Sequence, residues 1–126
     1  AELSQLVEWF SEHLGPDTPL HFTAYHPDYK LDALPTPAAT LLRARELARA
    51  AGLRNVYLGN LPLSTGQDTS CAQCGATVIS RSTYRITGFR LNANGACRGC
   101  GAALAGHFES SPGHFGPRRV PLTIGP

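Results

Sequence analysis

Two short cysteine motifs constrain the fold of this chain more than any other feature. The first reads Cys71-Ala72-Gln73-Cys74-Gly75 and the second reads Cys97-Arg98-Gly99-Cys100-Gly101, and together they hold all four cysteines. Two sulfurs separated by two residues can point at one ion, and the glycine that follows each pair permits a tight turn. Two such motifs facing each other predict a closed tetrahedral site of four thiolates, the kind that holds a structural zinc ion.

Three other interpretations fit the same cysteines. A Cys-x-x-Cys disulfide is usually a redox device, and no thioredoxin-like βαβ pattern precedes either motif. A rubredoxin-like iron site uses the same four ligands, so the sequence leaves zinc and iron open. Unrelated free cysteines also favour protein cores, but chance rarely places four of them as two matched pairs. We therefore predict a zinc site, with the ligands Cys71, Cys74, Cys97 and Cys100.

Charge is distributed unevenly between the two halves of the 126-residue chain. Residues 1–66 carry five basic and seven acidic side chains, whereas residues 67–126 carry six and two, so the cysteine half is the basic one. The excess of basic side chains in the second half is compatible with an anionic binding partner. No apolar run approaches the ~18 residues that a membrane span needs, and thiols kept reduced for a metal suit the cytoplasm, where we place the protein.

The first half reads as a short α/β unit. Apolar residues recur at helical spacing over residues 3–14, with Trp9 expected in the packed interior, and Gly15-Pro16 ends that helix. Residues 20–25 suit a strand. A second helix is expected after Thr36 as N-cap and Pro37 as first helical residue, ending at Gly52, and residues 56–58 form a second strand.

Strand, helix and strand at this spacing predict a βαβ crossover with parallel strands. Because a parallel sheet needs both faces covered, two strands and two helices cannot complete it. The chain also begins at Ala1 inside an expected helix and contains no methionine. We therefore expect a fragment, the terminal piece of a larger parallel sheet or barrel.

The second half reads as a small β unit. Residues 61–69 have loop composition and are predicted as a linker. Residues 77–81 and 84–91 alternate like antiparallel strands between the two cysteine motifs, which is the pattern of a zinc ribbon over residues 70–108. Two histidines that follow, His107 and His114, are expected at the surface rather than as ligands. Residues 109–126 are predicted as an extended or flexible tail.

Several segments, in order, resemble one family. The run His21 to Lys30, then Pro35-Thr36-Pro37, then Gly52 to Asn60, then the two cysteine motifs look like the C-terminal third of the AmmeMemoRadiSam-system radical SAM enzymes, relatives of the pyruvate formate-lyase activating enzymes. The resemblance implies that residues 1–60 are the C-terminal end of a partial (β/α) radical SAM barrel. It also implies a [4Fe–4S] cluster that cleaves S-adenosylmethionine, and AMMECR-like or Memo-like proteins as partners besides the remainder of the barrel.

The resemblance also implies a cofactor contact at the end of the first strand. In that family this strand end lies against the adenine of S-adenosylmethionine, which makes Tyr25, His26, Asp28 and Lys30 the candidate cofactor-binding residues. The chain departs from the family in lacking the Cys-x-x-x-Cys-x-x-Cys cluster motif. No catalytic residue is therefore predicted, and the isolated chain should be inactive.

Two other function classes compete with the enzyme fragment. A free-standing zinc-ribbon module could use Arg81, Arg85, Arg90 and Arg98 to bind nucleic acid or an acidic protein, although arginines on a ribbon are more often only a solvated face. A rubredoxin-like electron carrier would use the same cysteines but leaves the first half without a role. A reading frame that extends upstream into the cluster motif would favour the enzyme fragment.

Overall fold

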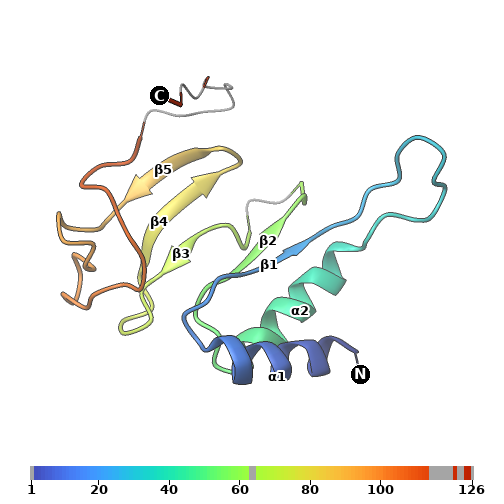
Figure 1. The fold of residues 1–126 in the computed structure, drawn as a ribbon, viewed down its shortest axis with the longest axis horizontal. Coiled ribbons are helices and arrows are strands. Elements are labelled where there is room, and N and C mark those ends of the chain that lie inside the picture. Colours follow the sequence, from blue (N-terminus) through green and yellow to red (C-terminus); the bar gives the residue numbers. More distant parts are fainter. Residues whose placement is uncertain (1, 63–64, 114–120, 122–123, 126) are drawn as a thin grey trace.

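The structure is a computed structural model that describes residues 2–62, 65–113, 121 and 124–125. Its first half contains α1 (Glu2–Leu14), β1 (Leu20–Thr23), α2 (Ala38–Ala50) and β2 (Val56–Gly59). Its second half contains β3 (Thr69–Ser70), β4 (Thr77–Ser82) and β5 (Arg85–Phe89). The fold is a small α/β protein with two small sheets, as Figure 1 shows.

The predicted parallel crossover is confirmed. β1 pairs with β2 in parallel, with Leu20 opposite Val56 and Thr23 opposite Gly59. One face of this sheet carries the apolar side chains of both strands, and the two helices cover it. The core there consists of Val7, Ala24, Leu41, Ala48, Leu53, Val56 and Leu58, with Phe10, Leu20 and Phe22 beside it.

The first helix is less buried than its periodicity predicted. Val7 is buried, but Leu6 and Leu14 on the expected apolar face are each 47% exposed. The expectation that Trp9 packs in the interior is wrong, because the indole is 52% exposed and stacks on His13 at a ring-centroid distance of 4.9 Å. Its i, i+4 spacing to His13 places the two rings on the same helix surface.

The start of α2 also differs from the prediction. Pro37 is the N-cap, without a side-chain hydrogen bond, and the hydroxyl of Thr36 instead accepts a hydrogen bond from the Tyr25 N–H at 3.0 Å. The Thr36 N–H donates to the Tyr25 carbonyl in return, which closes the base of the loop between β1 and α2.

The predicted end of α2 is close to the observed one. The helix ends at Ala50 with Ala51 as its C-cap, and Gly52, the expected cap, is the next residue, at φ 91. Leu53 N–H donates to the Ala48 carbonyl, which satisfies the helix terminus.

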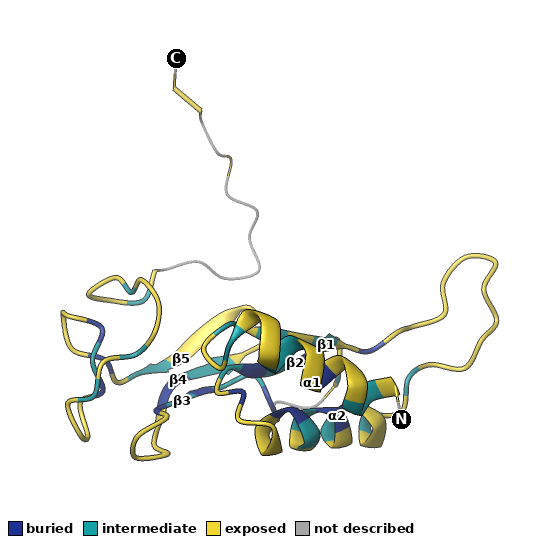
Figure 2. Ribbon diagram, turned by 60° about the horizontal axis from the view of Figure 1, so that its bottom comes forward, coloured by how far each residue is buried: buried dark blue, intermediate teal, exposed yellow. Residues whose placement is uncertain are grey.

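The loop between β1 and α2 projects from the molecule, and we call residues 26–35 the arm. Figure 1 shows it extending away from both sheets, and Figure 2 shows it exposed along its length. Three of its apolar side chains are open to solvent, with exposed fractions of 91% for Tyr29, 63% for Leu31 and 89% for Leu34.

The second half is a three-stranded antiparallel sheet in the order β3-β4-β5. We call residues 69–108 the ribbon. The two longer strands match the prediction, whereas β3 was not predicted and begins at Thr69, the last residue of the expected linker. The linker itself returns beside β2, where Leu58 N–H donates to the Gly66 carbonyl at 2.9 Å.

The expected tail falls largely outside the described residues. His114 and residues 115–120, 122–123 and 126 are among those not described, whereas His107 is exposed, as predicted.

Candidate metal centre

The ribbon brings the four cysteine sulfurs together. All four Sγ atoms lie within 4.8 Å of one another, with Cys71 to Cys100 at 3.6 Å and Cys74 to Cys97 at 3.8 Å. These separations exceed a disulfide bond of about 2.0 Å, and all four cysteines are free. Four sulfurs at about 2.3 Å from a central zinc ion would lie about 3.8 Å apart at the corners of a tetrahedron. The cluster could therefore hold a metal ion.

The two cysteine motifs adopt the same turn. In the first, Cys71 N–H donates to the Ala76 carbonyl and Gly75 N–H donates to the Cys71 carbonyl. In the second, Cys97 N–H donates to the Ala102 carbonyl and Gly101 N–H donates to the Cys97 carbonyl. The closing glycines have nearly equal φ values of 74 and 76, in the left-handed region that other residues rarely adopt. The repeated geometry explains why each motif needs its glycine.

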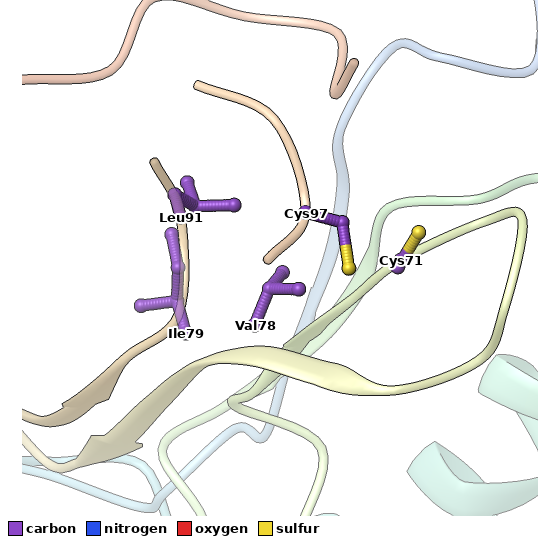
Figure 3. Close-up of a cluster of buried hydrophobic side chains, with 5 residues drawn as sticks. All are labelled: Cys71, Val78, Ile79, Leu91 and Cys97. Carbon is purple, nitrogen blue, oxygen red and sulfur yellow. The ribbon is translucent and has the colours of Figure 1, made fainter. Parts of the chain in front are cut away.

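The motifs also place each pair of sulfurs alike. Cys71 and Cys97, the first members, are buried, whereas Cys74 and Cys100 are exposed. The two buried cysteines belong to the apolar core of the ribbon, together with Val78, Ile79 and Leu91 (Figure 3). The sulfur cluster thus forms one end of that core, so metal binding and ribbon packing depend on the same side chains.

Backbone amides around the cluster favour thiolates. Gly99 N–H donates to the Cys97 sulfur at 3.3 Å. The Cys74 N–H, helped by the Gln73 N–H, lowers the pKa of the Cys71 thiol to about 7 despite its burial. Such N–H donors stabilise the charged form of a sulfur.

The Cys100 thiol loses its proton much less readily than the Cys71 thiol. The Ala102 N–H lowers the pKa of the Cys100 thiol, but burial and hydrogen bonds with the other three thiols outweigh it and raise that pKa to about 12. Four neighbouring thiolates repel one another, and a divalent cation between them removes that penalty. The cluster has the charge pattern of a cation site.

The four predicted cofactor-contact residues follow β1 along the chain. Tyr25 and His26, the first residue of the arm, come shortly after the strand, and Asp28 and Lys30 lie farther along the arm. There the Asp28 carboxylate accepts a hydrogen bond from the Tyr29 N–H at 2.7 Å, and Lys30 Nζ lies 5.2 Å from the Tyr29 ring centroid. Both side chains make local contacts, and their role with a cofactor stays a prediction.

His26 is fixed by a residue that the sequence analysis did not single out as part of a site. Its Nε2 donates to the Asn60 carbonyl at 3.0 Å, and the Asn60 side-chain amide donates to the Ala24 carbonyl at 3.0 Å. Asn60 adopts φ 58, a left-handed conformation that asparagine tolerates better than most residues. In the sequence, the Gly59-Asn60 pair at the end of β2 was the available signal for this contact. In the structure, Asn60 links the carboxyl ends of the two parallel strands.

A cleft of about 840 Å³ opens beside this strand end. It separates the uncovered face of the two-stranded sheet from the tip of the β4–β5 hairpin, and is lined among others by His21, His26, Tyr57, Arg81 and Tyr84. From the sequence, Arg81 was expected on the ribbon surface, either as a contact for nucleic acid or an acidic protein or as part of a solvated face. In the structure it packs against Tyr57, with the guanidinium carbon 5.6 Å from the ring centroid. Only the tertiary fold brings β2 and β4 to one cleft, so no local pattern marks it.

No helix in the described part of the chain combines the length and apolarity needed to cross a bilayer.

Comparison with known proteins gives one informative similarity. The chain is 42% identical over 105 residues to an uncharacterized protein of Methanocaldococcus jannaschii, MJ0808. The match covers 82% of this chain but 32% of that protein, so the chain spans about a third of the length of the curated relative it matches. No family model matches the chain. No solved structure matches it.

Proposed function

We propose that this chain is the C-terminal part of a radical SAM enzyme, carrying one structural zinc ion in its ribbon. In this proposal the α/β half closes the barrel beside the S-adenosylmethionine site. The single observation that favours it most is the parallel β1–β2 pair, covered by helices on one face and ending in the linked residues His26 and Asn60. Barrel enzymes build their sites at this carboxyl end of parallel strands.

Zinc suits the cluster because of its ligand set and shape. Four thiolates in a closed tetrahedron are typical of structural zinc, and such a site stabilises the fold rather than exposing an open position for chemistry. The ribbon core contains only three buried aliphatic side chains, Val78, Ile79 and Leu91, so the metal would supply much of its stability.

The radical chemistry would come from the remainder of a longer protein. A [4Fe–4S] cluster bound there would supply the electron that cleaves S-adenosylmethionine, and this chain offers no three-cysteine motif for such a cluster. The matched relative is long enough to contain a barrel in addition to the region that corresponds to this chain. We assign no catalytic role to any residue of this chain.

The alternative of a nucleic-acid-binding ribbon has less support. Two of the four ribbon arginines serve internal contacts: Arg81 donates to the Gln67 carbonyl and the Thr69 hydroxyl, and Arg98 Nε donates to the Leu91 carbonyl. Arg85, Arg90 and Arg98 are exposed, but within the described ribbon only Arg85 and Arg90 are free of such an internal contact, too few to form the basic surface that phosphate binding requires.

The test compares the longer protein with this chain. After anaerobic iron–sulfur reconstitution and reduction with dithionite, the longer protein should cleave S-adenosylmethionine to methionine and 5′-deoxyadenosine, whereas the 126-residue chain treated identically should form none. A longer protein that binds no iron–sulfur cluster, or that forms no 5′-deoxyadenosine, would reject the radical SAM assignment. Formation of 5′-deoxyadenosine by the short chain would instead show that the remainder of the longer protein is not needed for the chemistry. Neither result bears on the zinc site, which metal analysis tests separately.

A further inference from the structure

The cleft between the two sheets contains ribbon side chains that neither the metal site nor the proposed barrel uses. Its walls come from both halves of the chain: His21 and Tyr57 from the parallel strands, and Arg81, Thr83 and Tyr84 from the ribbon. Its volume of about 840 Å³ lies in the range of small-molecule sites. The ribbon is therefore a wall of a pocket as well as a metal-binding unit.

The cleft has a positive bias. Among the described residues that line it, one is arginine, two are histidines and none is acidic. The Arg81 guanidinium donates through Nη1 to the Gln67 carbonyl and the Thr69 hydroxyl, both neutral groups. In the described part of the chain no carboxylate forms an ion pair with this guanidinium, although the Asp68 carboxylate accepts the Arg81 backbone N–H at 2.8 Å. A half-buried guanidinium without a direct ion pair can still pair with an anionic ligand.

Aromatic rings stand on two sides of the cleft. The His21 and Tyr57 rings lie 5.0 Å apart at a tilt of 30°, side by side on the uncovered face of the parallel sheet. Tyr84 lies at the opposing hairpin tip and is 77% exposed. A flat ring entering between these walls can stack on one or both.

The hairpin tip is held in a strained conformation. Thr83 has φ 53, which is rare for a β-branched residue, and its N–H donates to the Gln67 side-chain carbonyl at 3.2 Å. Ser82 pairs with Arg85, so Thr83 and Tyr84 form a two-residue hairpin loop, and such loops call for a positive φ at a central residue. The tight loop places Tyr84 at the tip of the hairpin.

We propose that this cleft binds a small planar aromatic ligand that carries an anionic group. The ring lies between the His21–Tyr57 pair and Tyr84, and the anion pairs with Arg81. The cleft also reaches His26 and Asn60, the strand end that the proposed function places beside S-adenosylmethionine. The ring and anion contacts nevertheless come from the uncovered sheet face and the ribbon, and binding to this chain needs no iron–sulfur chemistry, so either proposal can fail without the other.

Titration with three probes shows whether binding needs both the aromatic ring and the anionic group of the ligand. The zinc-loaded 126-residue chain is titrated with 1-naphthyl phosphate, with 1-naphthol as the neutral aromatic compound and with inorganic phosphate as the anion alone. Amide shifts in a two-dimensional NMR spectrum report where each probe binds. We expect saturable binding of 1-naphthyl phosphate, with shifts at Tyr57, Arg81 and Tyr84, and binding of the other two probes weaker by about tenfold or more.

Two variants with matched controls test the residues. Tyr84→Ala should weaken binding of 1-naphthyl phosphate about three- to tenfold through lost stacking, whereas Tyr29→Ala, on the exposed arm, should leave it unchanged. Arg81→Gln should weaken it about tenfold or more, whereas Arg85→Gln, on the same hairpin but outside the cleft, should not.

The NMR spectrum shows whether each variant remains folded, and Tyr84→Ala tests the cleft even if Arg81→Gln unfolds. Shifts centred elsewhere, equal affinity for all three probes, or equal effects of Tyr84→Ala and Tyr29→Ala would overturn the proposal.

Discussion

Replacing Gly66 by alanine tests how the linker is fixed beside the parallel sheet. Gly66 has φ 90, and an added Cβ would lie 2.8 Å from Leu58 Cγ and 3.0 Å from Leu58 Cδ1. Leu58 is 3% exposed and belongs to the core under α2. The linker cannot retreat freely, because the Gly66 carbonyl accepts the Leu58 N–H.

The expected loss has two parts. Placing an L-residue in the left-handed region costs about 1–2 kcal/mol. Forcing an extra methyl group against a packed leucine costs a further ~1–3 kcal/mol. We therefore expect Gly66→Ala to lower the free energy of unfolding by about 2–5 kcal/mol.

A matched glycine separates these two parts. Gly52 has φ 91, and nothing lies within 4 Å of the position its Cβ would take. Gly52→Ala therefore carries the same backbone cost and the same change in the unfolded chain without the steric one. The difference between the two variants should equal the steric part.

Urea unfolding measures both variants. Far-UV circular dichroism and the fluorescence of Trp9, the only tryptophan, follow the transition. If the two variants lose the same free energy within about 0.5 kcal/mol, the linker does not pass as close to Leu58 as the structure shows.

Two further predictions concern the metal and the strand end. Cys97→Ser should abolish metal binding and broaden the NMR signals of the ribbon while those of α1 and α2 persist, because Cys97 contributes both a sulfur of the cluster and part of the ribbon core. Ala72→Ser changes an exposed residue that is not a ligand and should leave the metal bound. A Cys97→Ser variant that retains a full metal complement would refute this prediction. In the longer protein, His26→Ala should weaken S-adenosylmethionine binding about five- to tenfold, because the strand end is no longer fixed, and Lys30→Ala tests the arm. Equilibrium dialysis measures the affinity and 5′-deoxyadenosine formation measures turnover. Wild-type affinity and turnover in both variants would remove these residues from the site.

Local sequence patterns predicted much of the fold. Helical periodicity and the glycine after α2 predicted the helices, because these signals depend on residues close in sequence. The parallel pairing of β1 with β2 followed from the strand–helix–strand order, because such a crossover joins parallel strands. The cysteine motifs likewise specified their own turns, since Gly75 and Gly101 provide the required positive φ.

Features that depend on distant partners could not be predicted in the same way. β3 spans two residues and is a strand only because β4 pairs with it, so no periodic pattern in the sequence predicts it. Thr36 looked like a helix cap, but Tyr25 competes for its hydroxyl across the base of the arm. Arg81 meets Tyr57 only after the ribbon folds beside the parallel sheet, which is why the cleft was missed.

Zinc X-ray absorption spectroscopy of the reduced chain, purified without chelators, tests whether the four cysteines bind zinc. We predict one zinc per chain with four sulfur neighbours at about 2.3 Å, a geometry that fits the spacing of Cys71, Cys74, Cys97 and Cys100. A chain that contains no zinc, or a zinc ion with nitrogen or oxygen neighbours in place of any of the four sulfurs, would contradict this prediction.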